Sequence, residues 1–366
     1  MKERLVSLDA FRGITIAGMI LVNNPGSWSH IYPPLGHAAW HGWTPTDFIF
    51  PFFLFIVGVA MAFSFPGQIE KLTTQQIYLK ILRRTLTLFG LGLLLTLFPF
   101  FNFAEMRIPG VLQRIAVCYA IASVIYLNTN LRQQIGITGI LLLAYWAIMK
   151  LIPVPGYGAG DLSVEGNLAA YIDFSLLKGH MWKETWDPEG ILSTIPAIAT
   201  TLTGILTGHW LRSGKPREEI AGWMFVAGWL AIVAGLFWGI AFPINKSLWT
   251  SSYVVFTSGC ALQFLGFCYW LIDVKGIQKW AKPAIIYGMN AIAVFVLSGL
   301  LARVFIFTKI SGPDGQSISL KQWIYETLFT SWLSPLNASL GYAILNVVFW
   351  LAMMTILYRK RIFIKI

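Results

Sequence analysis

The sequence predicts an all-α polytopic membrane protein, and three of its features lead to that fold class. The 366 residues are 56% apolar and 12% charged, with a mean hydropathy of +0.66, whereas soluble domains are about half apolar and a quarter charged. Apolar runs of roughly 18 residues or more, the length that crosses a bilayer, recur along the whole chain. Basic residues stand mostly at the ends of these runs.

We expect a bundle of about ten transmembrane helices in a single integral-membrane domain, residues 1–366, because no segment between the apolar runs has the size of a soluble domain. An even number of spans places both termini on one side of the membrane. The N-terminal segment MKERLVSLDAFRG leads directly into the first span, so we expect no removable signal peptide. The expected helices cover residues 8–24, 44–65, 77–98, 108–127, 134–152, 191–211, 218–242, 249–272, 283–305 and 339–358.

The distribution of lysine and arginine predicts that both termini are cytoplasmic. In that orientation seventeen basic residues, among them Lys2, Arg4 and Lys365, fall on the cytoplasmic side and six on the other, as the positive-inside rule requires. The net charge of +11 is therefore explained by topology and by anionic membrane lipids, and we expect no nucleic-acid partner.

The cysteines and the charged pair of the first span have structural explanations. Cys118, Cys260 and Cys268 lie inside apolar runs without CxxC spacing, which indicates neither a disulfide framework nor a metal site. Asp9 and Arg12 lie three residues apart, so they share one helical face and can pair.

The junction between the first and second spans concentrates polar residues at the outer face. Asn23 ends the first span, where its amide either caps the helix or donates to a reacting carbonyl. Thr44 and Asp47 begin the second span, and helix capping explains both. Capping does not explain His37 and His41, which stand just before it at the depth where water meets lipid. This segment is the first candidate for an active site.

Cationic and amide side chains inside or beside the spans are candidates for holding an anionic ligand. An arginine within an apolar helix keeps its proton and needs a carboxylate, a carbonyl cage or an anion. Cation clusters at the cytoplasmic ends of helices suit lipid headgroups, and a phosphate-bearing cofactor would use the same groups. These candidates are Gln113, Arg114, Arg83, Arg84, Lys279 and Lys282.

The outer segment 153–190 is acidic and aromatic. It carries Trp182, Trp186, Asp187 and Glu189, a composition that suits a cationic, ring-shaped ligand such as an amino sugar. Depletion of lysine and arginine from outer loops by topology is an equally good explanation of its acidity. In the last outer segment, KQWIYETLFTSWLS predicts a short interfacial helix.

Taken together, several motifs resemble the transmembrane acetyltransferase family typified by heparan-α-glucosaminide N-acetyltransferase, with its bacterial members of the NagX type. The motifs that carry the resemblance are LDAFRGITIAGMILVNNPG (8–26), GHAAWHGWTPTDFIFPFFLFIVG (36–58), RIPGVLQRIAVCY (107–119), DPEGILSTIPAI (187–198), PINKSLWTSSYVV (243–255) and GMNAIAVFV (288–296).

The resemblance implies an acetyltransferase of the bacterial inner membrane. The enzyme would take an acetyl group from its cosubstrate, cytoplasmic acetyl-CoA, and transfer it to the amino group of a terminal glucosaminide on the periplasmic side. The resemblance also suggests a homodimer. The family's catalytic histidine corresponds to His37 in HAAWHG and a second functional residue to Asn23. Asp47 would orient the imidazole, and Trp40 and His41 in the same motif would contact the acceptor.

Two chemical routes and two other functions stay open at this stage. His37 either accepts the proton of the attacking amine or forms an acetyl-imidazole intermediate itself. The bacterial relatives also raise the alternative of an N-acetylglucosamine-type transporter, although a secondary transporter typically shows a repeat architecture and we detect no internal repeat. The other alternative is O-acetylation of an envelope glycan.

Overall fold

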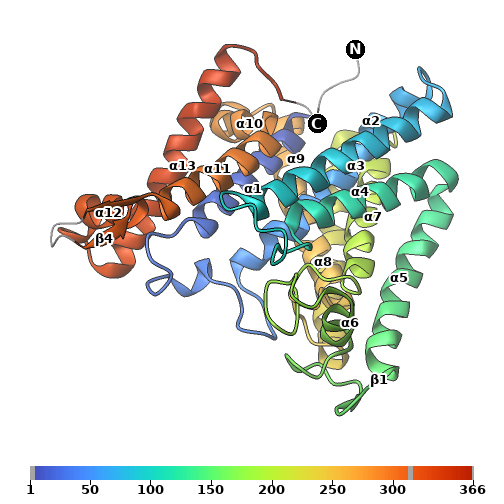
Figure 1. Cartoon of the computed structure of the whole chain (residues 1–366). Helices are drawn as coiled ribbons and strands as arrows, with labels where there is room; N and C mark the ends of the chain where they lie inside the picture. The colour runs from blue at the N-terminus through green and yellow to red at the C-terminus, as the bar shows by residue number, and fades with distance from the viewer. Residues whose placement is uncertain (1–4, 312–315, 365–366) are drawn as a thin grey trace.

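The computed structural model describes residues 5–311 and 316–364, which form a bundle of helices with two short β-hairpins (Figure 1). Lys2, Arg4 and Lys365 lie outside the described residues. The first turn of α1 and the last turn of α13 lie at the same end of the bundle in Figure 1.

A helix occupies each of the ten predicted positions, with one of them broken in two. The helices are α1 (Val6–Asn23), α2 (Ile49–Ile69), α3 (Thr74–Leu97), α4 (Val111–Asn128), α5 (Leu131–Leu151), α7 (Thr194–Leu211), α8 (Arg217–Ala241), α9 (Ser251–Tyr269), the pair α10 (Lys282–Met289) and α11 (Ala291–Phe307), and α13 (Pro335–Arg359).

Shorter elements lie between these helices. Two of them, α6 and α12, are short helices, and α12 overlaps the segment for which an interfacial helix was predicted. The hairpins pair Val154 with Gly158 and Ile310 with Ile318 in antiparallel register. The shorter elements are β1 (Pro153–Val154), β2 (Gly158–Ala159), α6 (Leu168–Leu177), β3 (Lys309–Ser311), β4 (Ser317–Ser319) and α12 (Leu320–Tyr325).

Seven helices of the described chain are long and apolar enough to cross a membrane, or eight if the bent pair α10 and α11 counts as one span. The multi-pass fold is therefore confirmed, but the predicted number of ten spans exceeds what length and composition support. The difference lies in α3 and α7. Helix α3 carries Lys80, Arg83 and Arg84, and α7 is rich in threonine and ends near His209.

The prediction of one continuous helix over 283–305 is wrong. The chain bends by 69° between α10 and α11, and Asn290 lies at the break. Its side chain holds a distant segment: Nδ2 donates to the carbonyl of Ile362 at 3.1 Å, and the amide of Ile364 donates to Oδ1 at 2.9 Å. Irregular backbone at bilayer depth is tolerated where it lines a cavity, and Gly288 and Met289 do so here.

Helix α1 lies between two groups of helices (Figure 1). On one side it packs against α10, α11 and α13, and on the other against α2 and α9. Within the larger group α2 packs on α7, α3 on α4 and α8 on α9. The main cavity lies where the two groups meet, so its walls come from both.

The contact between α2 and α7 depends on small residues. A Cβ atom at Gly58 would come within 1.9 Å of the Thr201 carbonyl oxygen, and one at Gly204 within 2.0 Å of the Phe55 carbonyl oxygen. Glycines that face the partner helix in this way let helix backbones approach closely in a membrane. This contact fixes the wall of α2 that faces the cavity.

We expect Gly58→Ala to destabilise the protein by about 1–3 kcal/mol, because the methyl group forces α2 away from α7. Thermal unfolding of the purified protein in detergent measures the effect. Gly222→Ala is the matched control, since a Cβ at Gly222 on α8 meets nothing within 4 Å. Equal melting temperatures for the two variants would contradict the close contact.

Candidate active site

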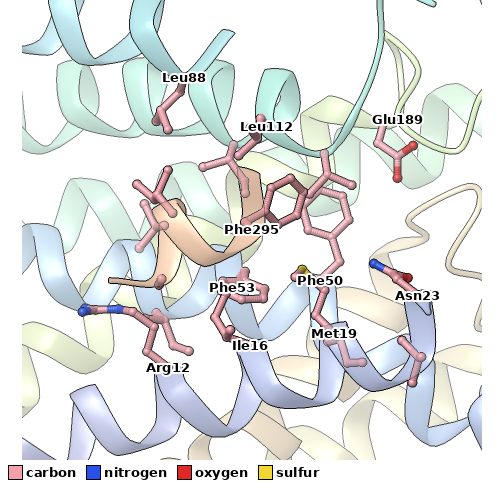
Figure 2. A pocket seen from close by; sticks show the side chains of 18 of the residues that line it. Arg12, Ile16, Met19, Asn23, Phe50, Phe53, Leu88, Leu112, Glu189 and Phe295 are labelled. Carbon is pink, nitrogen blue, oxygen red and sulfur yellow. The ribbon is translucent and has the colours of Figure 1, made fainter. Parts of the chain in front are cut away.

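A cavity of about 1320 Å³ runs along α1 between the two groups of helices. Its lining includes Asp9 and Arg12 in the first half of α1 and Asn23 at the end of this helix. Along the helix axis Asp9 and Asn23 are about 20 Å apart, at 1.5 Å per residue. Figure 2 shows Arg12 at one end, and Asn23 and Glu189 at the other. Apolar side chains line the passage between them, including Ile16, Met19, Phe50, Phe53, Leu112 and Phe295. The cavity therefore joins two polar ends through an apolar middle.

His37 and Asp47 form the central pair at the outer end. His37 Nδ1 lies 2.7 Å from Asp47 Oδ1; the carboxylate is 1% exposed and the imidazole 50% exposed. A carboxylate can only accept, so Nδ1 carries a proton in this contact, and in the neutral form of the ring the lone pair is on Nε2. His37 lines the cavity, and the arrangement presents a basic nitrogen from a fixed ring.

Asp47 both caps the turn that leads into α2 and orients the imidazole of His37. Its Oδ1 accepts from His37, while Oδ2 accepts the backbone N–H of Thr44 at 2.9 Å and that of Ala38 at 3.1 Å. The backbone N–H of Thr44 precedes the 3₁₀ turn Pro45–Phe48 that leads into α2. Both explanations considered for this residue therefore apply, one for each oxygen.

Two contacts tie the HAAWHG loop to the loop between α8 and α9. Gly42 donates its N–H to the Ile244 carbonyl at 2.8 Å, and Asn245 Nδ2 lies 3.3 Å from His41 Nδ1. Gly42 has φ +100°, a conformation that glycine adopts readily. Burial lowers the pKa of His41, so its neutral ring accepts from Asn245. The predicted role of His41 with the acceptor stays a prediction, and the structure adds this loop contact.

The same loop carries Lys246, a cavity-lining residue that the sequence analysis did not select. Its Nζ lies 3.2 Å from both His37 Nδ1 and His37 Nε2, and 4.0 Å from Asp47 Oδ1. The sequence feature that could have pointed to Lys246 is its position in the motif PINKSLWT, where it follows Asn245, a residue that is buried in the structure.

Arg107 anchors the acidic outer segment. Its Nε and Nη2 donate to the two oxygens of Asp187 at 2.8 and 2.6 Å, and Nη2 also donates to Glu189. Burial disfavours the guanidinium charge, but the bonds and charges of Asp187 and Glu189 outweigh it and raise the pKa of Arg107. Asp187 has no exposed side-chain surface, and each of its oxygens also accepts a backbone N–H. Asp187 therefore holds the loop, and its predicted role in substrate binding stays a prediction.

The structure brings some of the other predicted substrate residues to the cavity. Trp182 and Glu189 line it. Trp40 and Trp186 lie outside its lining and pack edge to face, with ring centroids 5.2 Å apart. Trp40 also donates its indole N–H to the Leu162 carbonyl.

Of the six predicted cofactor-binding residues, only Arg84 lines the cavity among the described residues. Its guanidinium lies over the Tyr119 ring at 4.6 Å, and its Nε is buried without a hydrogen-bond partner in the described chain. Arg114 instead donates to the Gly190 carbonyl and Ser193, and Gln113 is buried beside Gly92 and Gly110. The other three candidates are exposed and lie away from the cavity lining: Arg83, Lys279 and Lys282.

Fold and site together define a multi-pass membrane protein with a histidine–aspartate pair of enzymatic type at one end of a cavity along its first helix. The family described as "Heparan-alpha-glucosaminide N-acetyltransferase, catalytic" matches residues 4–236. The chain belongs to this family of membrane acetyltransferases.

Two animal relatives align with the whole chain. Heparan-alpha-glucosaminide N-acetyltransferase from Homo sapiens is 29% identical over 426 aligned residues, which cover 100% of this chain and 60% of the human protein. The Mus musculus protein of the same name is 29% identical over 424 residues, covering 100% of this chain and 61% of the mouse protein. The chain thus spans about three fifths of the length of these relatives.

We expect Arg107→Met to destabilise the protein by about 3–5 kcal/mol, because it leaves the buried carboxylate of Asp187 without its counter-charge. Thermal unfolding and limited proteolysis of segment 178–186 measure the loss. Lys183→Met is the control, since Lys183 is exposed in the same segment. Wild-type stability of the Arg107 variant would show that the pair does not hold the loop.

Proposed function

We propose that the protein is an N-acetyltransferase that moves the acetyl group of cytoplasmic acetyl-CoA to the amino group of a terminal glucosaminide on the other side of the membrane. Family membership supports the reaction class. The observation that carries the proposal is the cavity itself, which joins Arg12 and Arg84 to His37. We further propose the bacterial inner membrane as its location, a NagX-type relationship, both termini in the cytoplasm and a homodimer as the assembled form.

The residues present fit acetyl-CoA. The inner part of the cavity offers Arg84, whose buried Nε lacks a partner in the described chain, and an unpaired buried donor is expensive unless a ligand accepts from it. The apolar middle suits a slender uncharged arm. When bound, acetyl-CoA supplies an acetyl thioester, the activated form of the group to be transferred. Arg84 and Arg12 would hold its anionic end.

His37 handles the proton in this scheme. Its Nε2 accepts the proton that the amine nitrogen loses as the new C–N bond forms, and it returns that proton to the sulfur as the C–S bond breaks. Positioned proton transfer of this kind contributes about 10² to 10⁴-fold in rate. Asp47 keeps the ring in the required tautomer through Oδ1.

Asn23 supplies a neutral donor beside the reaction. Its side chain lines the outer end of the cavity, and its amide N–H groups can donate to the carbonyl oxygen as negative charge develops there. The exposed Trp182 offers an aromatic surface to the acceptor sugar, while Arg107 covers one face of that ring at 5.1 Å from the centroid.

We expect His37→Ala to lower the rate of acetyl transfer by about 10² to 10⁴-fold. Wild type and variant are reconstituted in vesicles, with acetyl-CoA on one side and a glucosamine acceptor on the other, and the product is identified by mass spectrometry. His30→Ala is the matched control, since His30 is exposed and does not line the cavity.

Each result of this assay decides a part of the proposal. Unchanged turnover in the His37 variant removes the imidazole from the chemistry. An ester in place of an amide product assigns O-acetylation. Uptake of N-acetylglucosamine into vesicles that lack acetyl-CoA, without acetylation of any acceptor, assigns transport.

We expect Asn23→Ala to lower kcat by about 10² to 10³-fold, as loss of a donor to a developing oxyanion does, and to leave the melting temperature unchanged. Asn24→Ala is the neighbouring control, because Asn24 bonds the Ile20 carbonyl of its own helix and does not line the cavity. Equal kcat values for the two variants would show that Asn23 does not act in the reaction.

A further inference from the structure

Lys246 places an ammonium group against the imidazole of His37. Its Nζ is equally far, 3.2 Å, from the two ring nitrogens. A point in the ring plane at that range from both would collide with Cε1, so Nζ lies over the face of the ring. A substrate group that approaches His37 Nε2 from the cavity therefore lies beside the Lys246 ammonium.

The position of Lys246 is fixed by the residue before it. Asn245 is fully buried, its Oδ1 accepts the Leu248 N–H at 2.9 Å, and its own N–H donates to Thr250 Oγ1 at 3.1 Å. The contacts of Gly42 with Ile244 and of Asn245 with His41 then bind this turn to the HAAWHG loop. The backbone at Lys246 is therefore fixed relative to the loop that carries His37.

The Lys246 ammonium is partly buried and has N–H donors that no residue of the described chain accepts from. Among the described residues, only the ring nitrogens of His37 lie within hydrogen-bond distance of Nζ. Because Nζ lies over the ring face, the in-plane lone pair of Nε2 does not accept from it, and the lysine side chain is 19% exposed. An ammonium has three N–H donors, so at least one remains for a ligand in the cavity. A purely structural lysine would satisfy these donors with carbonyl or carboxylate oxygens.

The charges around Lys246 oppose each other. Burial lowers the pKa of Lys246; the carboxylates of Glu189 and Asp47 raise it, and the guanidinium groups of Arg114 and Arg107 lower it. Since the lowering effects prevail, the ammonium deprotonates at a lower pH than an exposed lysine does. The imidazole of His37 faces the same group.

We propose that Lys246 is a catalytic residue, and this proposal rests on the proposed acetyl transfer. As the amine nitrogen bonds to the carbonyl carbon, the carbonyl oxygen gains negative charge, and the Lys246 ammonium stabilises that charge while keeping its own protons. When the C–S bond breaks, the C=O bond re-forms and the charge leaves the oxygen. His37 carries the proton from nitrogen to sulfur, so the two side chains act on different atoms of one intermediate.

The test compares Lys246→Met and Lys246→Arg with wild type over pH 6 to 10. We expect Lys246→Met to lower kcat about 10² to 10³-fold, with the KM for acetyl-CoA within about threefold of wild type. Lys246→Arg keeps a cation and recovers at least one tenth of the wild-type kcat. Wild-type kcat falls as pH rises through the pKa of Lys246, and this alkaline decline is absent from Lys246→Arg, because arginine does not deprotonate in this range.

Lys309→Met serves as the control, since Lys309 is exposed and outside the cavity lining. Wild-type kcat in Lys246→Met overturns the proposal. So does a pH profile for Lys246→Arg that matches wild type, because a merely structural lysine would leave the alkaline decline in place.

A readout without turnover separates this proposal from the proposed function. Competitive acetic anhydride labelling, followed by mass spectrometry of the peptide that contains residue 246, gives the deprotonation midpoint of that lysine. We expect it to lie below that of Lys309 and to coincide with the alkaline decline of kcat. A shifted midpoint in a wild-type protein that acetylates nothing would refute the acetyltransferase. Normal acetylation with an ordinary midpoint at residue 246 would refute the role of Lys246 alone.

Discussion

The outer half of the structure depends on the carboxylate of Asp47. It is almost completely buried and accepts hydrogen bonds on both oxygens, one set from the backbone that starts α2 and the other from the imidazole of His37. Moving a charge out of water is unfavourable unless fixed donors replace the hydration. The donors here belong to the loop that carries His37, so the position of the ring is determined by the same bonds that begin the helix. Tyr253 on α9 adds a bond to the Asp47 carbonyl, which joins this turn to the bundle core.

Charge is placed differently at the two ends of the cavity. At the outer end Arg107 is neutralised by Asp187 and Glu189, and the ion pairs position a loop. Along the inner part Arg84 has an aromatic ring beneath it and a buried donor without a partner in the described chain. Paired charges stabilise a wall, whereas the spare donor of Arg84 belongs to a side chain that lines the cavity. The difference between these arginines lies in their neighbours, since both side chains have the same chemistry.

The sequence predicted the features that depend on composition and on local motifs. Apolar runs located every long helix, TPTD predicted the start of α2, and the HAAWHG motif selected His37. The break at Asn290 was not predictable, because the apolar run GMNAIAVFV has no proline there and the bend accompanies bonds to residues 362 and 364. The contact between His37 and Lys246 joins residues 209 positions apart. Arg114 looked suited to a ligand, and only the direction of its side chain in the fold shows that it turns to Gly190 and Ser193.

The cavity is built from both halves of the chain. Its walls from α1 to α4 come from the family-matched stretch 4–236, whereas Lys246, Phe295 and Ile364 come from beyond it. A fragment that stops at residue 236 would keep His37 and Asp47 but would turn one long side of the passage, including Ile16 and Met19, towards lipid. Lipid acyl chains would then fill the space of the cavity, and the remaining histidine–aspartate pair would stand at the edge of an open groove.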